Sequence, residues 1–259
     1  MKKGHWIMSD QIKLRIKFQK TGAIRYIGHL DVMRFFQKCL RRAEIDVCYT
    51  TGFSPHQILT FAAPLSVGVE SLGEYMDVEV HSVTSSEDIV RRLNEASVPE
   101  IRIVSAKRLP EGAGNAMASV AAAEYLVRFR EGRIPSLFQE KPEEISGQIL
   151  SFLTLESIPY QKEGKKGMRE VDLRPGILSM QWNAEDQSLN MLLLASSGEN
   201  VKPSQVLSAF LGLHGQELQD NSLQITRLDV YTRKSDVEES SADLISSLIS
   251  MNEVGDDFS

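Results

Sequence analysis

The chain has 259 residues, of which 42% are hydrophobic and 25% are charged, as in an average soluble globular protein. This composition excludes a disordered chain and a collagen, and the two cysteines, Cys39 and Cys48, are too few for a disulfide framework. No stretch approaches the roughly 18 apolar residues of a membrane helix. The first residues carry the charges of a signal peptide but lack its apolar core. We therefore expect a cytoplasmic protein of one or two domains with no membrane association.

Charge is distributed unevenly along the chain. The formal net charge is −6, yet residues 11–43 carry +8 and the 216 residues after them carry −15. The basic residues of this segment are Lys13, Arg15, Lys17, Lys20, Arg25, Arg34, Lys38, Arg41 and Arg42. A basic patch on an acidic body is typical of a polyanion site. In the alternative interpretation, the same number of basic residues belongs to an ordinary basic strand and to the solvated face of a helix.

The first elements in chain order predict one compact unit. Residues 12–18 alternate between apolar and charged side chains, which indicates a half-buried strand. Residues 29–43 repeat apolar side chains at about 100° per residue, which indicates an amphipathic helix with a basic outer face. Further elements are expected at residues 58–62 (strand), 75–83 (strand), 85–96 (helix) and 101–109 (strand). The order β-α-β-β-α-β is the ferredoxin-like arrangement.

The same order of elements recurs after a small-residue boundary at residues 111–116. The expected elements are a strand at 120–130, a helix at 141–155, a ribbon at 158–162 and 168–173, strands at 177–183 and 188–195, a helix at 203–211 and a strand at 223–232. We therefore predict an α+β protein of two tandem ferredoxin-like (βαββαβ) halves, residues 11–110 and 118–233. The second half carries an inserted β-ribbon, and residues 234–259 form an acidic tail.

Candidate functional side chains are densest at the start of the first helix. Backbone N–H groups there lack partners and the helix dipole is positive, which favours anions. A phosphate held by these amides would gain a bidentate partner in Arg34, with Arg25 nearby. In the alternative interpretation, His29 caps the helix and Asp31 interacts favourably with its dipole. The residues alone leave both open.

A second candidate is the stretch at residues 52–56, Gly-Phe-Ser-Pro-His. Gly52 and the following proline predict a turn that presents Phe53, Ser54 and His56. Because this turn follows the first helix, His56 is a candidate to meet His29.

Two histidines on adjoining segments suggest two kinds of chemistry. His29 and His56 could act as general acid and base on RNA, with Asp31 as a third candidate catalytic residue. The same three side chains could instead ligate a metal. Because the sequence has no HxH or HxxxH spacing, we expect no metal site.

Residues 68–77 hold two glycines and several acids at the entry to a strand. They lack the GxxxxGK[ST] and GxGxxG spacings of nucleotide sites. Glu70 or Glu74 could act as a base, but we favour an ion pair with the basic helix.

Several segments taken together resemble a known family, the radical-SAM-linked protein family. They are residues 27–34 (Ile-Gly-His-Leu-Asp-Val-Met-Arg), 52–56, 68–71, 74–75, 171–175 (Val-Asp-Leu-Arg-Pro) and 201–203. That family is a bacterial domain of unknown function, encoded beside or fused to a radical SAM protein. The resemblance covers residues 13–233. Two positions depart from the pattern: Gly28 stands where serine is usual, and Gln57 stands where proline is usual.

The resemblance implies that the chain works with a radical SAM protein. The chain has no CxxxCxxC motif for the cluster of that chemistry, so we expect no cofactor. We expect a non-catalytic accessory partner that binds and presents an RNA substrate through its basic N-terminal half. The residues expected to contact RNA are Lys13, Arg15, Lys17, Arg25, Arg34, Lys38, Arg41 and Arg42. The alternatives are a protein-docking module without RNA binding, and an RNA-processing or RNA-modifying enzyme that uses His29 and His56.

The basic side chains are expected on two separate surfaces. By the alternation of their strand, Lys13, Arg15 and Lys17 should face an open side of the sheet. The basic stripe of the first helix should face away from the sheet on its other side, so a single RNA could not use both surfaces fully.

Overall fold

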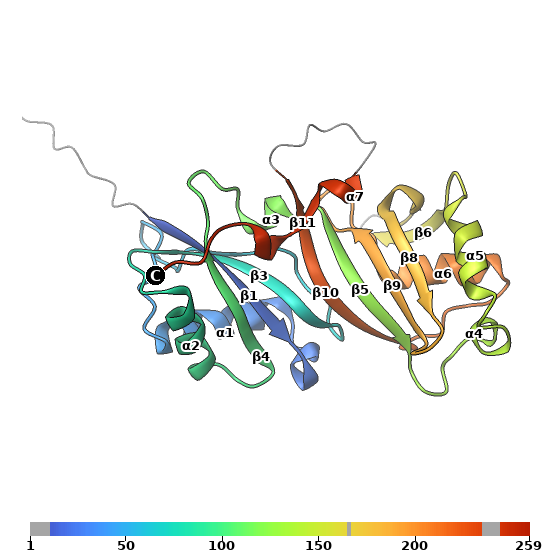
Figure 1. Cartoon of the computed structure of the whole chain (residues 1–259), viewed down its shortest axis with the longest axis horizontal. Helices are drawn as coiled ribbons and strands as arrows, with labels where there is room; N and C mark the ends of the chain where they lie inside the picture. Colours follow the sequence, from blue (N-terminus) through green and yellow to red (C-terminus); the bar gives the residue numbers. More distant parts are fainter. Residues whose placement is uncertain (1–10, 165–166, 235–243) are drawn as a thin grey trace, which may run out of the picture. The chain divides into compact units, whose positions relative to one another are not determined.

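The computed structural model describes residues 11–164, 167–234 and 244–259 and divides into two compact units. Unit 1 takes in the chain up to Gly68, Leu72–Ser119 and Ser250–Ser259, and unit 2 takes in Val69–Ser71 and Val120–Ile249. Each unit combines a sheet with helices (Figure 1), so the chain is a mixed α+β protein, as predicted. No helix in the described ranges is long and apolar enough to cross a membrane.

Unit 1 follows the predicted order of strands and helices. Its main elements are β1 (Ile12–Lys20), α1 (His29–Arg42), β2 (Leu59–Phe61), β3 (Glu70–Val80), α2 (Ser86–Glu95) and β4 (Ile101–Arg108). The strands lie in the order β4-β1-β3, with β2 paired to β3. Three short elements were not predicted, the 3₁₀ turns η1 (Gly22–Tyr26) and η4 (Met251–Glu253) and the helix α3 (Ala116–Ser119).

The core of unit 1 lies between the sheet and its two long helices. The alternation of β1 buries Leu14, Ile16 and Phe18 on the helix side, as predicted. The Phe36 ring of α1 meets that of Phe18 with centroids 4.6 Å apart. The buried apolar side chains of both helices are Val32, Phe36, Cys39, Leu40, Ile89 and Leu93. At roughly 1.5–3 kcal/mol for each large apolar side chain, this layer is the main source of the unit's stability.

The outer face of this sheet is covered, which contradicts the expectation that Lys13, Arg15 and Lys17 lie on an open face. Arg15 is only 2% exposed and forms a bidentate ion pair with Asp77, which is 4% exposed, at 2.8 and 3.0 Å. Arg15 therefore has a structural role and is not available to RNA. The strand alternation identified the correct face, but it could not show what covers it.

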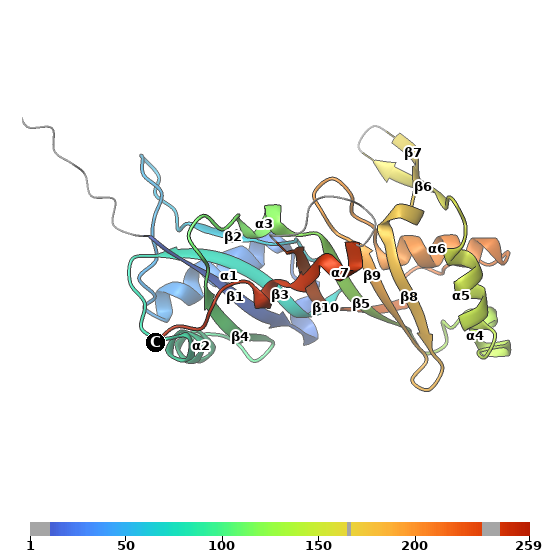
Figure 2. The same cartoon turned by 45° about the horizontal axis from the view of Figure 1, so that its top comes forward.

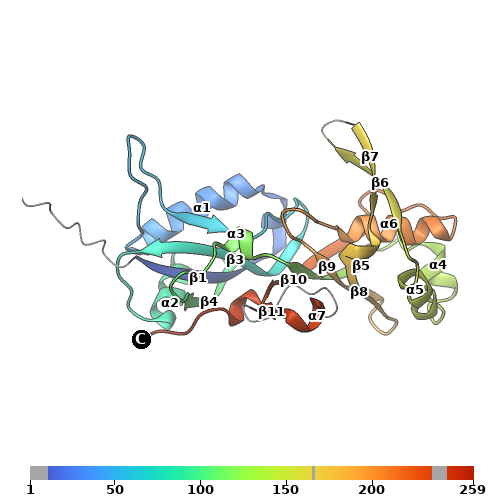
Figure 3. The same ribbon diagram turned by 90° about the horizontal axis from the view of Figure 1, so that it is seen from above.

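The C-terminal segment, Ser250–Ser259, runs along the outer face of unit 1. It lies on the opposite side of the sheet from α1 (Figure 3). Its bonds to β3 and β4 include Ser250 with the Tyr75 hydroxyl at 3.1 Å, Asn252 with Ser105, and Asp257 with Lys107 at 3.0 Å. Residues 250–259 are thus part of a folded unit, and the prediction that residues 234–259 form an acidic tail is wrong for them. Residues 235–243 of that prediction lie outside the described residues.

The end of the C-terminal segment also fixes the start of α2. The Phe258 N–H donates to the Ser86 hydroxyl at 3.0 Å, and the Ser86 N–H donates to the Phe258 carbonyl at 2.9 Å. Asp256 and Arg108 exchange two backbone hydrogen bonds. The segment therefore joins α2 to β4, two elements far from it in the sequence.

Unit 2 repeats the alternation of strands and helices. Its main elements are β5 (Ala122–Phe129), α4 (Ser136–Glu140), α5 (Ile145–Leu153), β6 (Pro159–Gly164), β7 (Gly167–Asp172), β8 (Ile177–Asn183), β9 (Ser188–Leu194), α6 (Pro203–Leu213) and β10 (Leu223–Arg233). The strands lie in the order β10-β5-β9-β8. The predicted ribbon is confirmed, because β6 and β7 form a separate two-stranded sheet (Figure 2).

Two parts of unit 2 differ from the prediction. The helix expected at residues 141–155 is observed as the shorter α5, and α4, which was not predicted, precedes it; Lys141 between them has φ −144° and ψ 58°. Lys141 precedes Pro142, which disfavours the helical conformation in the residue before it. The first residues of β3, Glu70 and Ser71, pair in parallel with β10, whereas the sequence predicted that this strand starts only at residue 75.

Removing the charge of Asp77 is expected to leave Arg15 buried without its counter-charge. We expect Asp77→Asn to lower the free energy of unfolding by about 3–5 kcal/mol, measured by urea denaturation. The double variant Arg15→Met with Asp77→Leu should recover most of that loss, because a buried ion pair can be replaced by apolar side chains at little cost. Asp31→Asn is the control, since its exposed pair with Arg34 should contribute less than about 1 kcal/mol. Equal losses in the single and the double variant would contradict this account.

A methyl group at Gly255 is expected to displace the C-terminal segment. Gly255 has φ +93°, and an added Cβ would lie 2.5 Å from the Arg108 carbonyl oxygen. We expect Gly255→Ala to cost about 1–3 kcal/mol and to speed proteolytic cleavage within the segment. Gly198→Ala serves as the control, because its φ is not positive and its Cβ would meet no atom within 4 Å. Equal cleavage rates in the two variants would argue against a segment held at Gly255.

Candidate functional site

The start of α1 is ordered by its backbone rather than by a histidine cap. Gly28 is the N-cap residue, and its carbonyl accepts from the Asp31 N–H at 3.1 Å. His29 is the first helical residue, so it does not cap the helix. Asp31 and Arg34 pair at 3.3 Å, but both are more than half exposed, so the pair adds little stability. Arg34 therefore keeps its side chain in solvent.

A polar cluster lies beneath the first turn of α1, with Lys20 and Glu74 buried and His29 half-buried. His29, Lys20 and Glu74 line a small cavity, and the His29 ring stands edge-on to Phe61 at 5.2 Å. The apolar lining consists of Phe18, Val32, Phe61, Ala63 and Leu65. The space open to the centre of a water molecule is about 10 Å³, which is room for one water at most. The cavity therefore cannot admit a nucleotide.

Lys20 gives this cluster a structural role. Its ammonium is 2% exposed and donates to the carbonyls of Ile27, at 3.0 Å, and Arg25, at 3.5 Å. These bonds hold the backbone immediately before α1. In the sequence Lys20 is one of nine basic residues between positions 11 and 43, but it lies two residues after Phe18 and so points to the same inner face. That alternation was the signal that could have identified it.

The two candidate acids belong to different units. Glu70 lies in unit 2, where it pairs with Thr226 of β10. Glu74 lies in unit 1 and is buried on the inner face of β3, beside the cavity. The ion pair with the basic helix stays a prediction: Glu74 lies beneath α1, whereas Arg34, Lys38 and Arg41 of that helix are exposed.

The loop after α1 has a defined structure. Tyr49 and Gln57 form an antiparallel bridge, and the Thr50 N–H donates to the His56 carbonyl at 2.9 Å. The His56 N–H donates to the Thr50 hydroxyl at 3.1 Å, and the His56 Nδ1 lies 3.1 Å from that hydroxyl. Gly52 has φ +120°, in the left-handed region. The loop projects beyond the sheet on the side where α1 lies (Figure 3).

The structure does not bring His29 and His56 together. His29 lies at the start of α1 beside Phe61, which pairs with Met76 of β3. The loop that carries His56 leaves from the far end of α1, a helix of 14 residues and about 21 Å. A shared acid–base pair therefore does not fit this geometry. Among the described residues, no three His, Cys, Asp or Glu side chains are placed to hold a metal ion.

The cations of α1 form an exposed row. Arg34, Lys38 and Arg41 follow the i, i+4, i+7 spacing of one helix face, and all three are exposed. We call these three residues the α1 basic row. Arg42 lies beside the row, but its guanidinium donates to the Ala96 carbonyl at 2.6 and 3.2 Å, so it also joins α1 to α2. Arg25 is half-buried and stacks over the Tyr26 ring at 5.0 Å.

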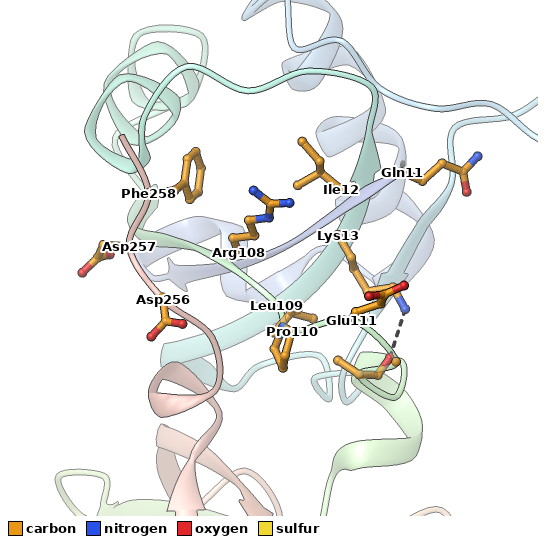
Figure 4. A pocket seen from close by; sticks show the side chains of 12 residues that line it. Gln11, Ile12, Lys13, Arg108, Leu109, Pro110, Glu111, Asp256, Asp257 and Phe258 are labelled. Atoms are coloured by element: carbon orange, nitrogen blue, oxygen red, sulfur yellow. Dashed lines mark hydrogen bonds between the residues drawn. The ribbon is translucent and has the colours of Figure 1, made fainter. Parts of the chain in front are cut away.

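The cations of β1 are held by the protein itself. Lys13 donates to the Ala113 carbonyl at 3.2 Å, as the dashed line in Figure 4 shows. Lys17 lies over the Tyr75 ring at 5.5 Å. Of these three side chains only Arg15 is buried, so the prediction of RNA contact is wrong for Arg15 and stays a prediction for the half-buried Lys13 and Lys17.

An open groove of about 790 Å³ lies at the ends of β1 and β4 (Figure 4). Lys13 and Arg108 line it together with Glu111, Asp256 and Asp257. Its walls carry both signs of charge, so the groove has no uniformly positive surface.

The motif at residues 171–175 has a structural role. The Asp172 carboxylate accepts the N–H groups of Ile158, at 2.8 Å, and Arg174, at 2.9 Å. These backbone hydrogen bonds lower the pKa of Asp172. Arg174 in turn donates to the carbonyls of Leu153 and Ile177. The motif thus ties β7 to α5 and β8 within unit 2.

Comparison with protein families gives one finding about the whole chain. Residues 13–203 match the model of a family described as an uncharacterized protein conserved in bacteria, DUF2344. No curated protein matches the chain. The matched residues include the start of α1, the loop with His56 and the motif around Asp172. Because the match spans most of the sequence, the chain belongs to this bacterial family.

Proposed function

We propose that the chain is an accessory partner of a radical SAM enzyme and binds an RNA substrate through unit 1. The observation that carries RNA binding is the α1 basic row next to a loop that exposes Phe53 and Tyr49. Cations that track phosphates and aromatic rings that stack on bases are the two halves of a single-strand site. The motifs shared with the radical-SAM-linked family support the partner role, and the missing CxxxCxxC motif assigns the cluster to the other protein.

We infer that each unit is a ferredoxin-like domain. The strand orders β4-β1-β3-β2 and β10-β5-β9-β8 support this. The elements of unit 1 follow the order β-α-β-β-α-β, and those of unit 2 follow it when the ribbon β6–β7 is set aside and α4 and α5 are taken together. In unit 1 the outer face of the sheet is occupied, so binding falls to the helix side. A cytoplasmic location agrees with Cys39 and Cys48, which are both free thiols.

Reversing two charges of the α1 basic row is expected to weaken RNA binding. With three phosphates contacted, the logarithm of the binding constant should fall against the logarithm of salt concentration with a slope of about −2. Lys38→Glu with Arg41→Glu should lower the affinity at least tenfold and make the slope shallower by about 1.4, the share of two phosphates. Titration of a fluorescent single-stranded RNA across a salt series measures both values.

The matched control is Arg102→Glu with Arg133→Glu, which changes the net charge equally on exposed residues outside α1. This control should keep the wild-type slope. Equal losses in both double variants would show that total charge, and not the α1 basic row, governs binding.

A second candidate function is docking of the radical SAM protein without RNA. It is favoured by the exposed Tyr26 and Leu30 beside the α1 basic row, since an apolar centre with a charged rim is typical of a protein interface. In that case the wild-type chain should not bind RNA. Lys38→Glu with Arg41→Glu and, separately, Leu30→Ser should each lower affinity for the radical SAM protein at least tenfold, measured by calorimetry. Unchanged affinity in both variants would exclude this face as the dock.

A further inference from the structure

Phe53 is placed where it contributes nothing to the core. Its relative exposure is 112%, the highest among the exposed large hydrophobic side chains of the described residues. Burying a phenylalanine stabilises a fold by roughly 1.5–3 kcal/mol. Because Phe53 is fully exposed, it contributes none of this stabilisation. An aromatic side chain held entirely in solvent on a structured loop is suited to a binding partner.

The loop that carries Phe53 is built to hold it in place. The Tyr49–Gln57 bridge closes its base, and the bonds between Thr50 and His56 brace its two sides. Gly52 turns the chain with φ +120° immediately before Phe53. Pro55 restricts the chain on the other side, because its ring fixes φ. Phe53 therefore sits at the tip of a loop with few ways to move.

His56 is the brace that joins these features. Its N–H and its Nδ1 both face the Thr50 hydroxyl at 3.1 Å, and the Nδ1 is 3.5 Å from the Ser54 carbonyl. A single Thr50 oxygen thus contacts two atoms of His56 across the loop. The same contacts occupy the Nδ1 face of the ring, and the separation from His29 removes its expected catalytic partner.

From this geometry we propose that Phe53 stacks on an unpaired base of the bound RNA and that His56 is the positioning residue that presents it. The inference rests on the RNA binding proposed above and specifies its contact with bases. Every base offers a flat π face, and stacking on an aromatic ring is tolerant of sequence. Tyr49, half exposed at the foot of the same loop, offers a second aromatic surface. The α1 basic row lies on the helix that leads into this loop and supplies partners for the phosphates.

The contact should be measurable as a loss of affinity for single-stranded RNA. We expect Phe53→Leu to weaken binding about tenfold, because one base stack is worth about 1–3 kcal/mol. Phe53→Tyr and Phe53→Trp should bind as the wild type does, since each keeps an aromatic face. Leu150→Ala, which shortens another exposed apolar side chain, on α5, is the control and should have no effect. Since Phe53 is exposed, all variants should melt at the wild-type temperature.

The role of His56 is tested by a double-variant cycle. His56→Ala should lower affinity by a similar factor, and combining it with Phe53→Leu should add little, because both changes remove one contact. His56→Asn should restore binding, since its amide can replace the Nδ1 contact with Thr50. A residue that binds phosphate independently would instead give additive losses, and that result would overturn the positioning role.

The experiment separates this inference from the function on which it rests. If the wild type binds RNA and Lys38→Glu with Arg41→Glu weakens it while Phe53→Leu does not, stacking is refuted and RNA binding stands. If the wild type does not bind RNA, both proposals fail. If Phe53→Leu weakens only binding of the radical SAM protein, the ring inserts into a protein pocket and the stacking proposal is overturned.

Discussion

The buried ion pair between Arg15 and Asp77 constrains both the fold of unit 1 and the placement of its positive charge. Two opposite charges in a sheet are stable away from water only when each satisfies the other, and the bidentate geometry achieves this. The pair lies on the face along which the C-terminal segment runs. The alternation in β1 predicts a sheet with one face in solvent, but in unit 1 the helices cover one face and the C-terminal segment runs along the other. The last ten residues of the chain are consequently part of the fold of its first hundred.

Covering this face redistributes the positive charge that the sequence concentrates in residues 11–43. Arg15 forms an ion pair with Asp77, and Lys20 donates hydrogen bonds to backbone carbonyls. Lys13 donates to a backbone carbonyl, and Lys17 lies over a tyrosine ring. The charge that remains in solvent is on α1. The fold therefore converts a diffuse basic segment into a short row on one helix. A row of this size fits a few phosphates or an acidic protein surface, and it cannot form an extended RNA track.

The two histidine motifs have acquired separate roles through the same fold. His29 is half-buried and lies against Phe61, beside a cavity too small for a substrate. His56 lies on an exposed loop and braces it through Thr50. The backbone before α1 is held by Lys20, which lines the same cavity as His29, and the loop of Phe53 is braced by His56. A helix of 14 residues between them is enough to prevent joint catalysis.

The sequence by itself determined the elements whose signal is periodic. The alternation in β1, the apolar stripe of α1, the ribbon β6–β7 and the order of strands and helices in both units followed from side-chain spacing, because periods of 2 and 3.6 residues are local properties. Only the tertiary structure decided which charged side chains are buried in ion pairs and which remain in solvent. Whether Arg15 meets solvent or Asp77 depends on a residue 62 positions away and on a C-terminal segment that local patterns assign to a tail. Burial of a charge requires long-range partners, and one-dimensional periodicity carries no information about them.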